Sequence, residues 1–390
     1  MTNVVYLDNN ATTRVDPQVL EAMLPYFSDY YGNPSSMHSF GGGVAAHIRT
    51  AREQLACLIG ASADEIVFTS CGTESDSTAI RAAIESYPAK RHLVTSRVEH
   101  PAVKNLFEVL AKKGYRTTFV PVDGRGRLDL DALYDSLSDD TAIVSLMWAN
   151  NETGVIFPVE EISRRVKERG IVFHTDAVQT VGKIPIDLAD TGVDMLSLSG
   201  HKIHGPKGIG ALYLRKGTKF SPFMIGGHQE RGRRGGTENT AAIVGLGKAA
   251  ELAQQHLDAG DYRCVSQLRD RLENALLSDV PHTMVNGERE HRLPNTASIA
   301  FEYVEGEAIL LMLNEHGICA SSGSACTSGS LEPSHVLRAM GVPFTAAHGS
   351  IRFSLSRYTT AGEIDLVLEK LPPIIARLRQ MSPFWAKRTA

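Results

Sequence analysis

The sequence lacks the features that mark membrane, secreted and nucleic-acid-binding proteins. None of its apolar runs reaches the roughly eighteen residues that a membrane-spanning helix needs. Residues 1–7 carry no basic stretch followed by an apolar core, so they do not resemble a signal peptide. Lys and Arg number 40 against 44 Asp and Glu, and this near balance does not favour nucleic acid or an anionic membrane as a partner. We therefore expect a cytoplasmic protein with neither kind of partner.

Cysteine is scarce as well. The five cysteines are Cys57, Cys71, Cys264, Cys319 and Cys326, and no two of them form a C-x-x-C pair. This spacing argues against a zinc finger or a thioredoxin-like site. An odd and sparse set in a chain of this kind also argues against a disulfide framework. At least one cysteine can instead be a free, reactive thiol. The sequence around each cysteine indicates which one it is.

Length and composition favour a large globular protein. The chain has 390 residues, of which 43% are hydrophobic and 22% charged, so it can bury a large core and leaves little room for disorder. Short apolar runs alternate with helical patterns through the first two-thirds, which predicts a mostly parallel seven-stranded sheet with helices on both faces. The expected strands are residues 65–69, 92–96, 117–122, 142–148, 171–175, 195–199 and 210–214, with helices such as 75–87, 101–113 and 159–169 between them.

The pattern changes after two long helical segments at residues 239–257 and 262–278. Short strands at 298–301, 318–320 and 351–355, closed by a helix at 361–381, favour a smaller α+β unit. Residues 259–261 form a break in the pattern. We therefore expect an α/β protein with a large domain of residues 15–258 and a small domain that combines residues 1–14 with 259–390.

Residues that follow the expected strands are candidates for a ligand site, because open parallel sheets bind ligands at the carboxyl ends of their strands. Gly72 and Thr73 open the helix after the first strand, where free N–H groups can bind an anion; an ordinary helix cap is the alternative. Asp176 ends the fifth strand, and an unpaired buried carboxylate is costly, so it should face a cation or a protonated ring. His100 and Asn151 follow two other strands, where structural and turn roles are the alternatives.

Lys202 follows the sixth expected strand, within residues 199–208 (SGHKIHGPKG). It lies one step past the strand end, beside Ser199 and His201, which suits a lysine that bonds covalently to an aldehyde cofactor near its phosphate. A basic surface turn is the alternative, and Lys207 is a rival lysine that lies further from the strand, after a proline. With the acid, the anion site and the imidazole, Lys202 completes the set of groups that pyridoxal 5'-phosphate needs.

Cys326 is the expected nucleophile. It lies in a run of small residues, 321–330 (SSGSACTSGS), which suits neither a core strand nor a stable helix, so we expect a mobile loop with a reactive thiol. Cys57 and Cys319 lie in helical and apolar patterns and are expected to be core residues. Cys264 should lie on a helix face.

Arg352 lies inside an expected strand of the second unit. Its sequence context allows two roles. Arg352 can form an ion pair at a sheet edge, or it can bind the carboxylate of an amino-acid substrate through two parallel hydrogen bonds. The glycine- and arginine-rich residues 226–237 are either a solvated loop or a segment that reaches a phosphate on a neighbouring subunit.

Taken together, these motifs resemble the pyridoxal-phosphate-dependent cysteine desulfurases of the nitrogen-fixation (NifS) type. The resemblance runs nearly end to end, with no departure at a catalytic position. Its motifs are YLDNNATT (residues 6–13), CGTES (71–75), VEHP (98–101), HTDAVQ (174–179), SGHK (199–202), SGSACT (322–327) and RFSLSR (352–357). Residues 233–239 (RRGGTEN) are closer to the nitrogen-fixation branch than to the housekeeping branch.

The resemblance implies an aspartate-aminotransferase-like fold (fold type I) and a homodimer. The active site would lie near the dimer interface, with Thr237 reaching the phosphate of the other subunit's cofactor. L-cysteine would become L-alanine, and Cys326 would carry the sulfur as a persulfide to an iron–sulfur scaffold protein, in particular for nitrogenase. During this transfer Cys326 would also be the protein's contact with the iron-containing cluster.

The resemblance also implies roles for the remaining residues. Lys202 removes the α-proton, Cys326 attacks the substrate sulfur as a thiolate, and His100 moves protons nearby. The substrate carboxylate would be held by Asn151 and Arg352, and the cofactor by Gly72, Thr73, His100, Asn151, Asp176, Gln179, Ser199, His201, Lys202 and Thr237. The alternatives are a selenocysteine lyase or another aminotransferase-fold enzyme and, in a different class, a non-catalytic sulfur or metal carrier.

Overall fold

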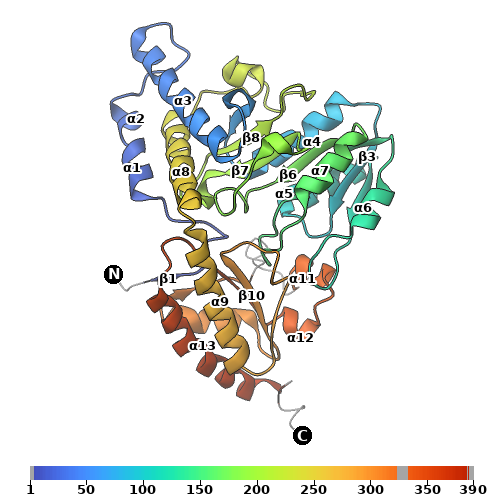
Figure 1. Ribbon diagram of the computed structural model, residues 1–390, viewed down its shortest axis with the longest axis vertical. Coiled ribbons are helices and arrows are strands. Elements are labelled where there is room, and N and C mark those ends of the chain that lie inside the picture. Colours follow the sequence, from blue (N-terminus) through green and yellow to red (C-terminus); the bar gives the residue numbers. More distant parts are fainter. Residues whose placement is uncertain (1–3, 323–332, 384, 386–390) are drawn as a thin grey trace.

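The computed structural model describes residues 4–322, 333–383 and 385. A seven-stranded sheet lies at the centre of the upper part of the molecule (Figure 1). In sheet order its strands are β2 (Ile66–Thr69), β8 (Gly210–Leu214), β7 (Met195–Ser199), β6 (Val172–Asp176), β5 (Thr141–Met147), β3 (His92–Ser96) and β4 (Arg116–Val120). β8 runs antiparallel to both of its neighbours, and the other neighbouring pairs are parallel. The predicted α/β fold with a mostly parallel seven-stranded sheet is confirmed.

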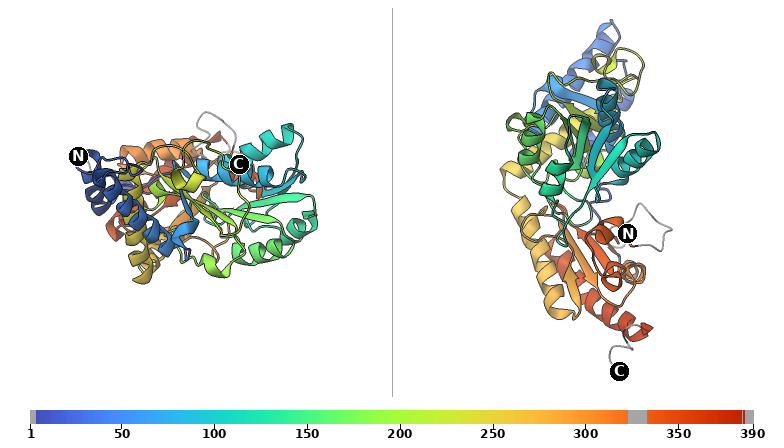
Figure 2. Two further views of the ribbon diagram at one scale, coloured as in Figure 1. Left: turned by 90° about the horizontal axis from the view of Figure 1, so that it is seen from above. Right: turned by 90° about the vertical axis from the view of Figure 1, so that its right-hand side faces the viewer.

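Each face of the sheet has its own hydrophobic core, because successive residues of a strand point to opposite faces. Leu93 of β3 packs in one core with Ile80 and Phe107, whereas its neighbour Val94 packs in the other with Ile162. The first core is covered by α4 (Gly72–Ser86) and α5 (Pro101–Lys112), and the second by α3 (Ser39–Leu58), α6 (Leu130–Ser136), α7 (Val159–Glu168) and α8 (Thr240–Asp258). Figure 2 shows these helices on the two sides of the sheet.

Helices α1 (Pro17–Met23), α2 (Pro25–Ser28) and α3 precede the sheet, in a stretch where the sequence pattern indicated a helix only around Cys57. Two glycines of α8 explain how they pack. A Cβ on Gly247 would lie 2.5 Å from Cα of Ala51 in α3, and a Cβ on Gly245 would lie 2.6 Å from Sδ of Met23 in α1. These helices therefore depend on close packing against α8 more than on a strong local pattern.

The lower part of the molecule in Figure 1 is a smaller α+β unit. A three-stranded antiparallel sheet has the order β12 (Ser350–Ser354), β10 (Thr296–Phe301), β9 (Thr283–Val285), and β1 (Val5–Tyr6) pairs in parallel with β11 (Ile318–Cys319). The helices along this part of the chain are α9 (Tyr262–Asp279), α10 (Gly306–Glu315), α11 (His335–Ala339), α12 (Phe344–Ala347) and α13 (Ala361–Met381). Among them, α11 packs Val336 and Leu337 into the second core of the large sheet.

The smaller unit has a separate core that joins the two ends of the chain. Val5 and Leu7 pack there with residues between Val265 and Ile375. This supports the division into residues 15–258 and residues 1–14 with 259–390, which stays our proposal. Across the described ranges, no helix combines the length and the apolar character that crossing a bilayer requires.

Candidate active site

A cavity of about 390 Å³ opens at the carboxyl ends of three parallel strands. Met147, Asp176 and Ser199, the last residues of β5, β6 and β7, all line it. Ten of the predicted site residues line it: Gly72, Thr73, His100, Asn151, Asp176, Gln179, Ser199, His201, Lys202 and Arg352. Cavities of roughly 300–1,000 Å³ are typical of small-molecule sites, so this one is large enough for a cofactor.

Two predicted site residues do not line this cavity in the described chain. Thr237 lines a separate pocket with Ser70 and Asn239, so its predicted contact with a cofactor phosphate would have to be made to another subunit. Cys326, predicted as the sulfur acceptor and as the contact with a cluster, lies outside the described residues. Among the residues that are described, no group of three or more His, Cys, Asp and Glu side chains could hold a metal ion.

The N-terminus of α4 has the form of an anion site. Cys71 precedes the helix without capping it through its side chain, so the first-turn N–H groups of α4 are available to a phosphate. Gly72 is required by close packing, because a Cβ there would lie 2.8 Å from Cγ2 of Val178. Ser199 and His201 approach from the end of β7, and burial lowers the pKa of His201 to about 4, so its ring is neutral at pH 7.

Asp176 presents a buried carboxyl group to the cavity. Its Oδ1 accepts a hydrogen bond from the N–H of Val178 at 2.9 Å, and the described residues offer it no salt bridge. Burial raises the pKa of Asp176, while the nearby His100 and Lys202 lower it. A carboxylate is stable at such a position when a cation faces it, and the protonated nitrogen of an aromatic ring is such a cation.

His100 begins α5 and turns one ring nitrogen toward its own helix. Nδ1 accepts a hydrogen bond from the N–H of Ala102 at 3.2 Å, which leaves Nε2 for the cavity. Burial lowers the pKa of His100 below its ordinary value. The neutral ring can therefore stack on an aromatic cofactor and exchange a proton through Nε2.

Lys202 holds its amine at the cavity through backbone carbonyls of the N-terminal segment. Nζ donates to the carbonyl oxygen of Asn10 at 2.5 Å and to that of Ala11 at 2.8 Å. The residue lies in the short 3₁₀ turn Gly200–Lys202 that continues β7. The rival Lys207 is exposed and does not line the cavity. The structure therefore places Lys202, and not Lys207, where an aldehyde could be bound.

Arg352 forms the ion pair that its sequence context left open, and it also lines the cavity. It is 3% exposed on β12, and its Nη2 forms an ion pair with Oδ1 of Asp8 at 2.8 Å. Nη1 donates to the carbonyl oxygen of Asn151 at 2.9 Å, whereas Nε has no hydrogen-bond partner within the described ranges. Because Arg352 also lines the cavity, its guanidinium retains donor capacity for a substrate carboxylate.

Sequence patterns assigned no role to several polar residues that line the cavity or lie near it. Asp76 and Glu99 are almost fully buried, and each has one oxygen without a hydrogen-bond partner in the described structure. Burial raises the pKa of Glu99 to about 8 and that of Asp76 well above its usual range. Asn10 donates through Nδ2 to the carbonyl oxygen of Asn151 at 3.1 Å and to Oγ1 of Thr296 at 2.9 Å. The sequence offered one signal for these residues. Asp76 is a charged residue four positions after Gly72, so it lies on the face of α4 that packs on the sheet.

The described cysteines differ partly from expectation. Cys57 is exposed, so its predicted place in the core is wrong: a helical pattern identifies α3 but does not show that this residue faces away from the sheet. Cys319 is half-buried and not fully in the core, and Cys264 is exposed on α9 as predicted. Cys71 lines the cavity beside the anion site.

These groups fit pyridoxal phosphate in number and in kind. A free helix N-terminus suits the phosphate, the buried Asp176 suits a protonated ring nitrogen, and the neutral His100 suits the ring face. The amine of Lys202 suits the aldehyde. The unpaired carboxyl group of Asp176 is the feature that the ring nitrogen explains best.

Replacing Asp176 by asparagine should weaken cofactor binding by ~10²- to 5 × 10³-fold, because truncating one partner of a buried ion pair costs about 3–5 kcal/mol. Titration of the cofactor-free protein with pyridoxal phosphate measures this affinity. Asp194→Asn is the matched control, since Asp194 is a largely buried acid at the opposite end of β7 that accepts a hydrogen bond from Phe173 N–H. Equal affinities of Asp176→Asn and the parent would contradict the assigned role.

Comparisons with known proteins identify the family of this chain. Residues 5–367 match the family model described as "Aminotransferase class-V". The chain is 63% identical over 382 residues to a cysteine desulfurase of Trichormus azollae, and 60% identical over 383 residues to the cysteine desulfurase NifS of Azotobacter vinelandii. Each alignment covers 98% of this chain and 95% of the relative. A solved structure described as a NifS-like protein superposes with a TM-score of 0.90 at 41% identity, covering 96% of this chain and 100% of that one. The chain therefore belongs to the class-V aminotransferase family and, within it, to the cysteine desulfurases, which are pyridoxal-phosphate-dependent enzymes.

Proposed function

We propose that this enzyme converts L-cysteine to L-alanine and places the sulfur atom on Cys326 as a persulfide, for delivery to an iron–sulfur scaffold protein that serves nitrogenase. The observation that carries the proposal is the shared cavity. The amine of Lys202, the acid Asp176, the anion site of α4 and the cation Arg352 all face it. Amine, acid and anion site suit the cofactor, and Arg352 suits the carboxylate of an amino acid.

The overall reaction balances without an external oxidant or reductant. L-cysteine and the thiol of Cys326 give L-alanine and a persulfide, so one C–S bond breaks and one S–S bond forms. The β-carbon of the substrate gains the hydrogen that replaces sulfur. When bound, pyridoxal phosphate supplies an electron sink next to the α-carbon of the substrate.

The residues around the cavity have distinct tasks in this proposal. Lys202 accepts the α-proton at Nζ, because its amine is held at the cavity by the carbonyls of Asn10 and Ala11. Arg352 binds the substrate carboxylate with Asn151, and His100 moves a proton at Nε2. Gln179 would bond the ring hydroxyl of the cofactor, and Thr73, Ser199 and His201 would hold its phosphate, since all four line the cavity.

Two observations support Cys326 as the sulfur acceptor: its sequence context, and the contacts of the described residues on either side of its segment. On one side Ser321 exchanges backbone hydrogen bonds with Arg352, at 3.2 Å and 2.6 Å. On the other side Oγ of Ser334 donates to Oε2 of Glu152 at 2.5 Å. The segment that contains Cys326 therefore begins beside the residue proposed to bind the substrate carboxylate.

We also propose that the enzyme is a homodimer with cofactor contacts across the interface. Thr237 does not line the cavity of its own chain, and it lies in a pocket where a second subunit could meet it. Large apolar side chains are exposed on α1–α3 and on residues 223–225, among them Leu24, Phe27 and Ile225. Exposed apolar residues of this number are typical of a surface that a partner covers. Sedimentation of the purified protein should give twice the monomer mass.

The test of the proposed activity is the stoichiometry of the products. Purified enzyme with L-cysteine and a thiol reductant should release alanine and sulfide in equal amounts. Adding a scaffold protein should move sulfur to the scaffold in place of free sulfide. Alanine production without sulfur transfer to any scaffold would contradict the proposed delivery, and selenide release from selenocysteine without activity on cysteine would favour a selenocysteine lyase.

Replacing Arg352 by lysine should raise KM for cysteine by ~10- to 100-fold with a smaller change in kcat, because hydrogen bonds to a charged partner contribute about 1.5–3 kcal/mol. Lysine keeps the positive charge but loses the planar pair of donors. Steady-state kinetics of the variant measure the effect. Arg338→Lys, on α11 and outside the lining of the cavity, is the control. An unchanged KM for Arg352→Lys would leave Arg352 as a structural ion pair with Asp8.

A further inference from the structure

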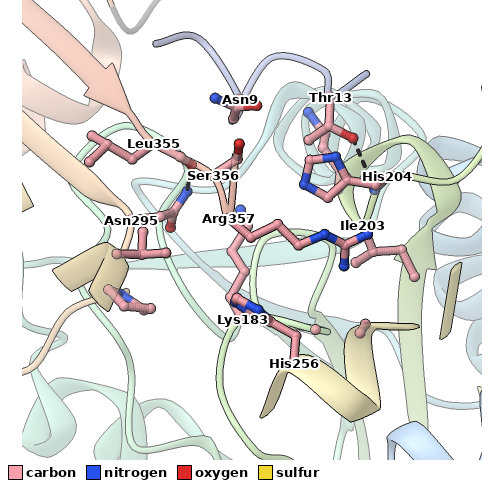
Figure 3. A pocket seen from close by; sticks show the side chains of 15 residues that line it. Asn9, Thr13, Lys183, Ile203, His204, His256, Asn295, Leu355, Ser356 and Arg357 are labelled. Carbon is pink, nitrogen blue, oxygen red and sulfur yellow. Dashed lines mark hydrogen bonds between the residues drawn. The ribbon is translucent and has the colours of Figure 1, made fainter. Parts of the chain in front are cut away.

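Lys183 lies behind the residues that face the large cavity and contacts two of them. Its Nζ donates to Oε1 of Gln179 at 2.8 Å and to Oδ1 of Asn10 at 3.2 Å. Figure 3 shows Lys183 in a second, smaller cavity of about 50 Å³, where it lies with His204 and Arg357. Lys183 therefore bonds to side chains of the cofactor cavity from the side away from it.

Asn10, one of the two residues that Lys183 contacts, carries an acceptor of the catalytic amine, and Gln179, the other, donates to that same acceptor. The carbonyl oxygen of Asn10 accepts from Nζ of Lys202 at 2.5 Å and from Nε2 of Gln179 at 2.9 Å. Oδ1 of Asn10 also accepts from Nδ2 of Asn295 at 3.0 Å. Asn10 and Gln179 are 2% and 6% exposed, so their amide groups depend on protein partners rather than bulk water.

Gln179 depends on Lys183 for its orientation. A glutamine amide has an oxygen that accepts and a nitrogen that donates, and the two ends differ only by their partners. Lys183 donates to the oxygen, and the nitrogen then points to the carbonyl of Asn10. Without this donor, the buried Oε1 of Gln179 would lose its hydrogen bond, and the amide group could rotate.

The amine of Lys183 contributes hydrogen bonds to this part of the structure, and not an ion pair. No carboxylate forms a salt bridge with Lys183 in the parts of the chain that the structure describes. Burial lowers the pKa of Lys183 well below its usual range, and the nearby cations Lys202 and Arg352 lower it further. Burying a charged lysine without a counter-ion beside two cations costs free energy. Charge neutralisation therefore does not explain why Lys183 lies here.

We propose that Lys183 is a positioning residue of the active site, whose two hydrogen bonds fix Gln179 and Asn10 and thereby the acceptors of Lys202. The inference rests on the proposed function of the large cavity as the pyridoxal phosphate site. It assigns Lys183 no contact with the cofactor or with the substrate. Its effect is exerted through Gln179 and Asn10.

Lys183→Met tests the proposal, because methionine keeps an unbranched apolar stem and removes the donor. The cofactor-free variant should bind pyridoxal phosphate on the order of tenfold more weakly than the parent, the loss expected for one buried hydrogen bond. The visible absorption maximum of the loaded variant should also shift, because Gln179 would no longer meet the ring in a fixed orientation. Lys248→Met is the control, since Lys248 lies on α8 and pairs with Glu251 at 2.9 Å. It should change neither quantity.

A double-mutant cycle with Gln179→Ala separates positioning from a general loss of stability. In the Gln179→Ala background, Lys183→Met should have a smaller effect on cofactor affinity, because one of the two partners through which it acts is gone. Additive effects, or an unchanged affinity and spectrum for Lys183→Met alone, would overturn the proposal. If Lys183→Met does not fold, Lys183→Leu, which also lacks a donor, gives the same cycle. Failure of the parent itself to bind pyridoxal phosphate would refute the proposed function, whereas binding that Lys183→Met leaves intact refutes only the role of Lys183.

Discussion

Replacing Lys202 by alanine should lower the rate of alanine formation by at least ~10³-fold, since general base catalysis alone contributes roughly 10²–10⁴-fold. The change removes the amine that the carbonyls of Asn10 and Ala11 hold at the cavity. It leaves the anion site of α4 and the carboxyl group of Asp176 unchanged, so the variant should still bind pyridoxal phosphate, but reversibly. The readouts are the alanine rate and the release of the cofactor on dialysis.

Lys207→Ala is the matched control for this experiment. Lys207 is five residues away, exposed and outside the lining of the cavity, so its removal should leave rate and cofactor retention unchanged. Borohydride treatment of the parent should attach the cofactor to a single peptide, the one that contains Lys202. Attachment to the peptide of Lys207 alone would move the assignment to that residue.

Replacing Cys326 by alanine should abolish sulfur transfer while the enzyme retains its cofactor and its visible spectrum. The reason is chemical: without a thiol at this position, the substrate sulfur has no protein nucleophile to accept it. A loss of ~10³-fold or more in sulfide release is expected, comparable to the removal of other catalytic nucleophiles. Sulfide release and persulfide labelling of the protein measure the effect.

Cys264→Ala is the control for Cys326→Ala. Cys264 is a free, exposed thiol on α9, so the comparison separates a specific acceptor from any accessible cysteine. The single variant Cys264→Ala should transfer sulfur at the parent's rate. Normal sulfide release by Cys326→Ala would contradict the proposal and would direct attention to Cys71, which lines the cavity.

The sequence predicted the large sheet because its signal is local. Strands of a parallel sheet are buried on both faces, and they therefore appear as short apolar runs such as Met195–Ser199, which β7 matches. The signal is weaker for helices that are held by packing. Residues 39–58 form α3 although three consecutive glycines follow Phe40, because Gly247 allows α8 to approach Ala51 closely.

The candidate site was predictable where chemistry follows a strand end. Asp176 and Lys202 stand directly after apolar runs, and parallel strands bring their carboxyl ends together. No such rule finds Asn10 or Lys183, whose roles depend on contacts with residues far away in the sequence. The contact of Asn10 with Lys202 joins positions 192 apart, and the bond of Arg352 to Asp8 joins positions 344 apart.

The amino-acid sequence by itself determined the sheet, the order of its strands along the chain and the chemical groups placed at their ends, because burial and residue type are local properties. The tertiary structure alone decided which groups meet. It placed Lys202 at the cavity and Lys207 outside it, joined Arg352 to both Asp8 and the cavity, and placed Thr237 away from the cavity of its own chain. The physical reason is that hydrogen bonds and ion pairs depend on distances between atoms, and chain segments hundreds of residues apart acquire those distances only on folding.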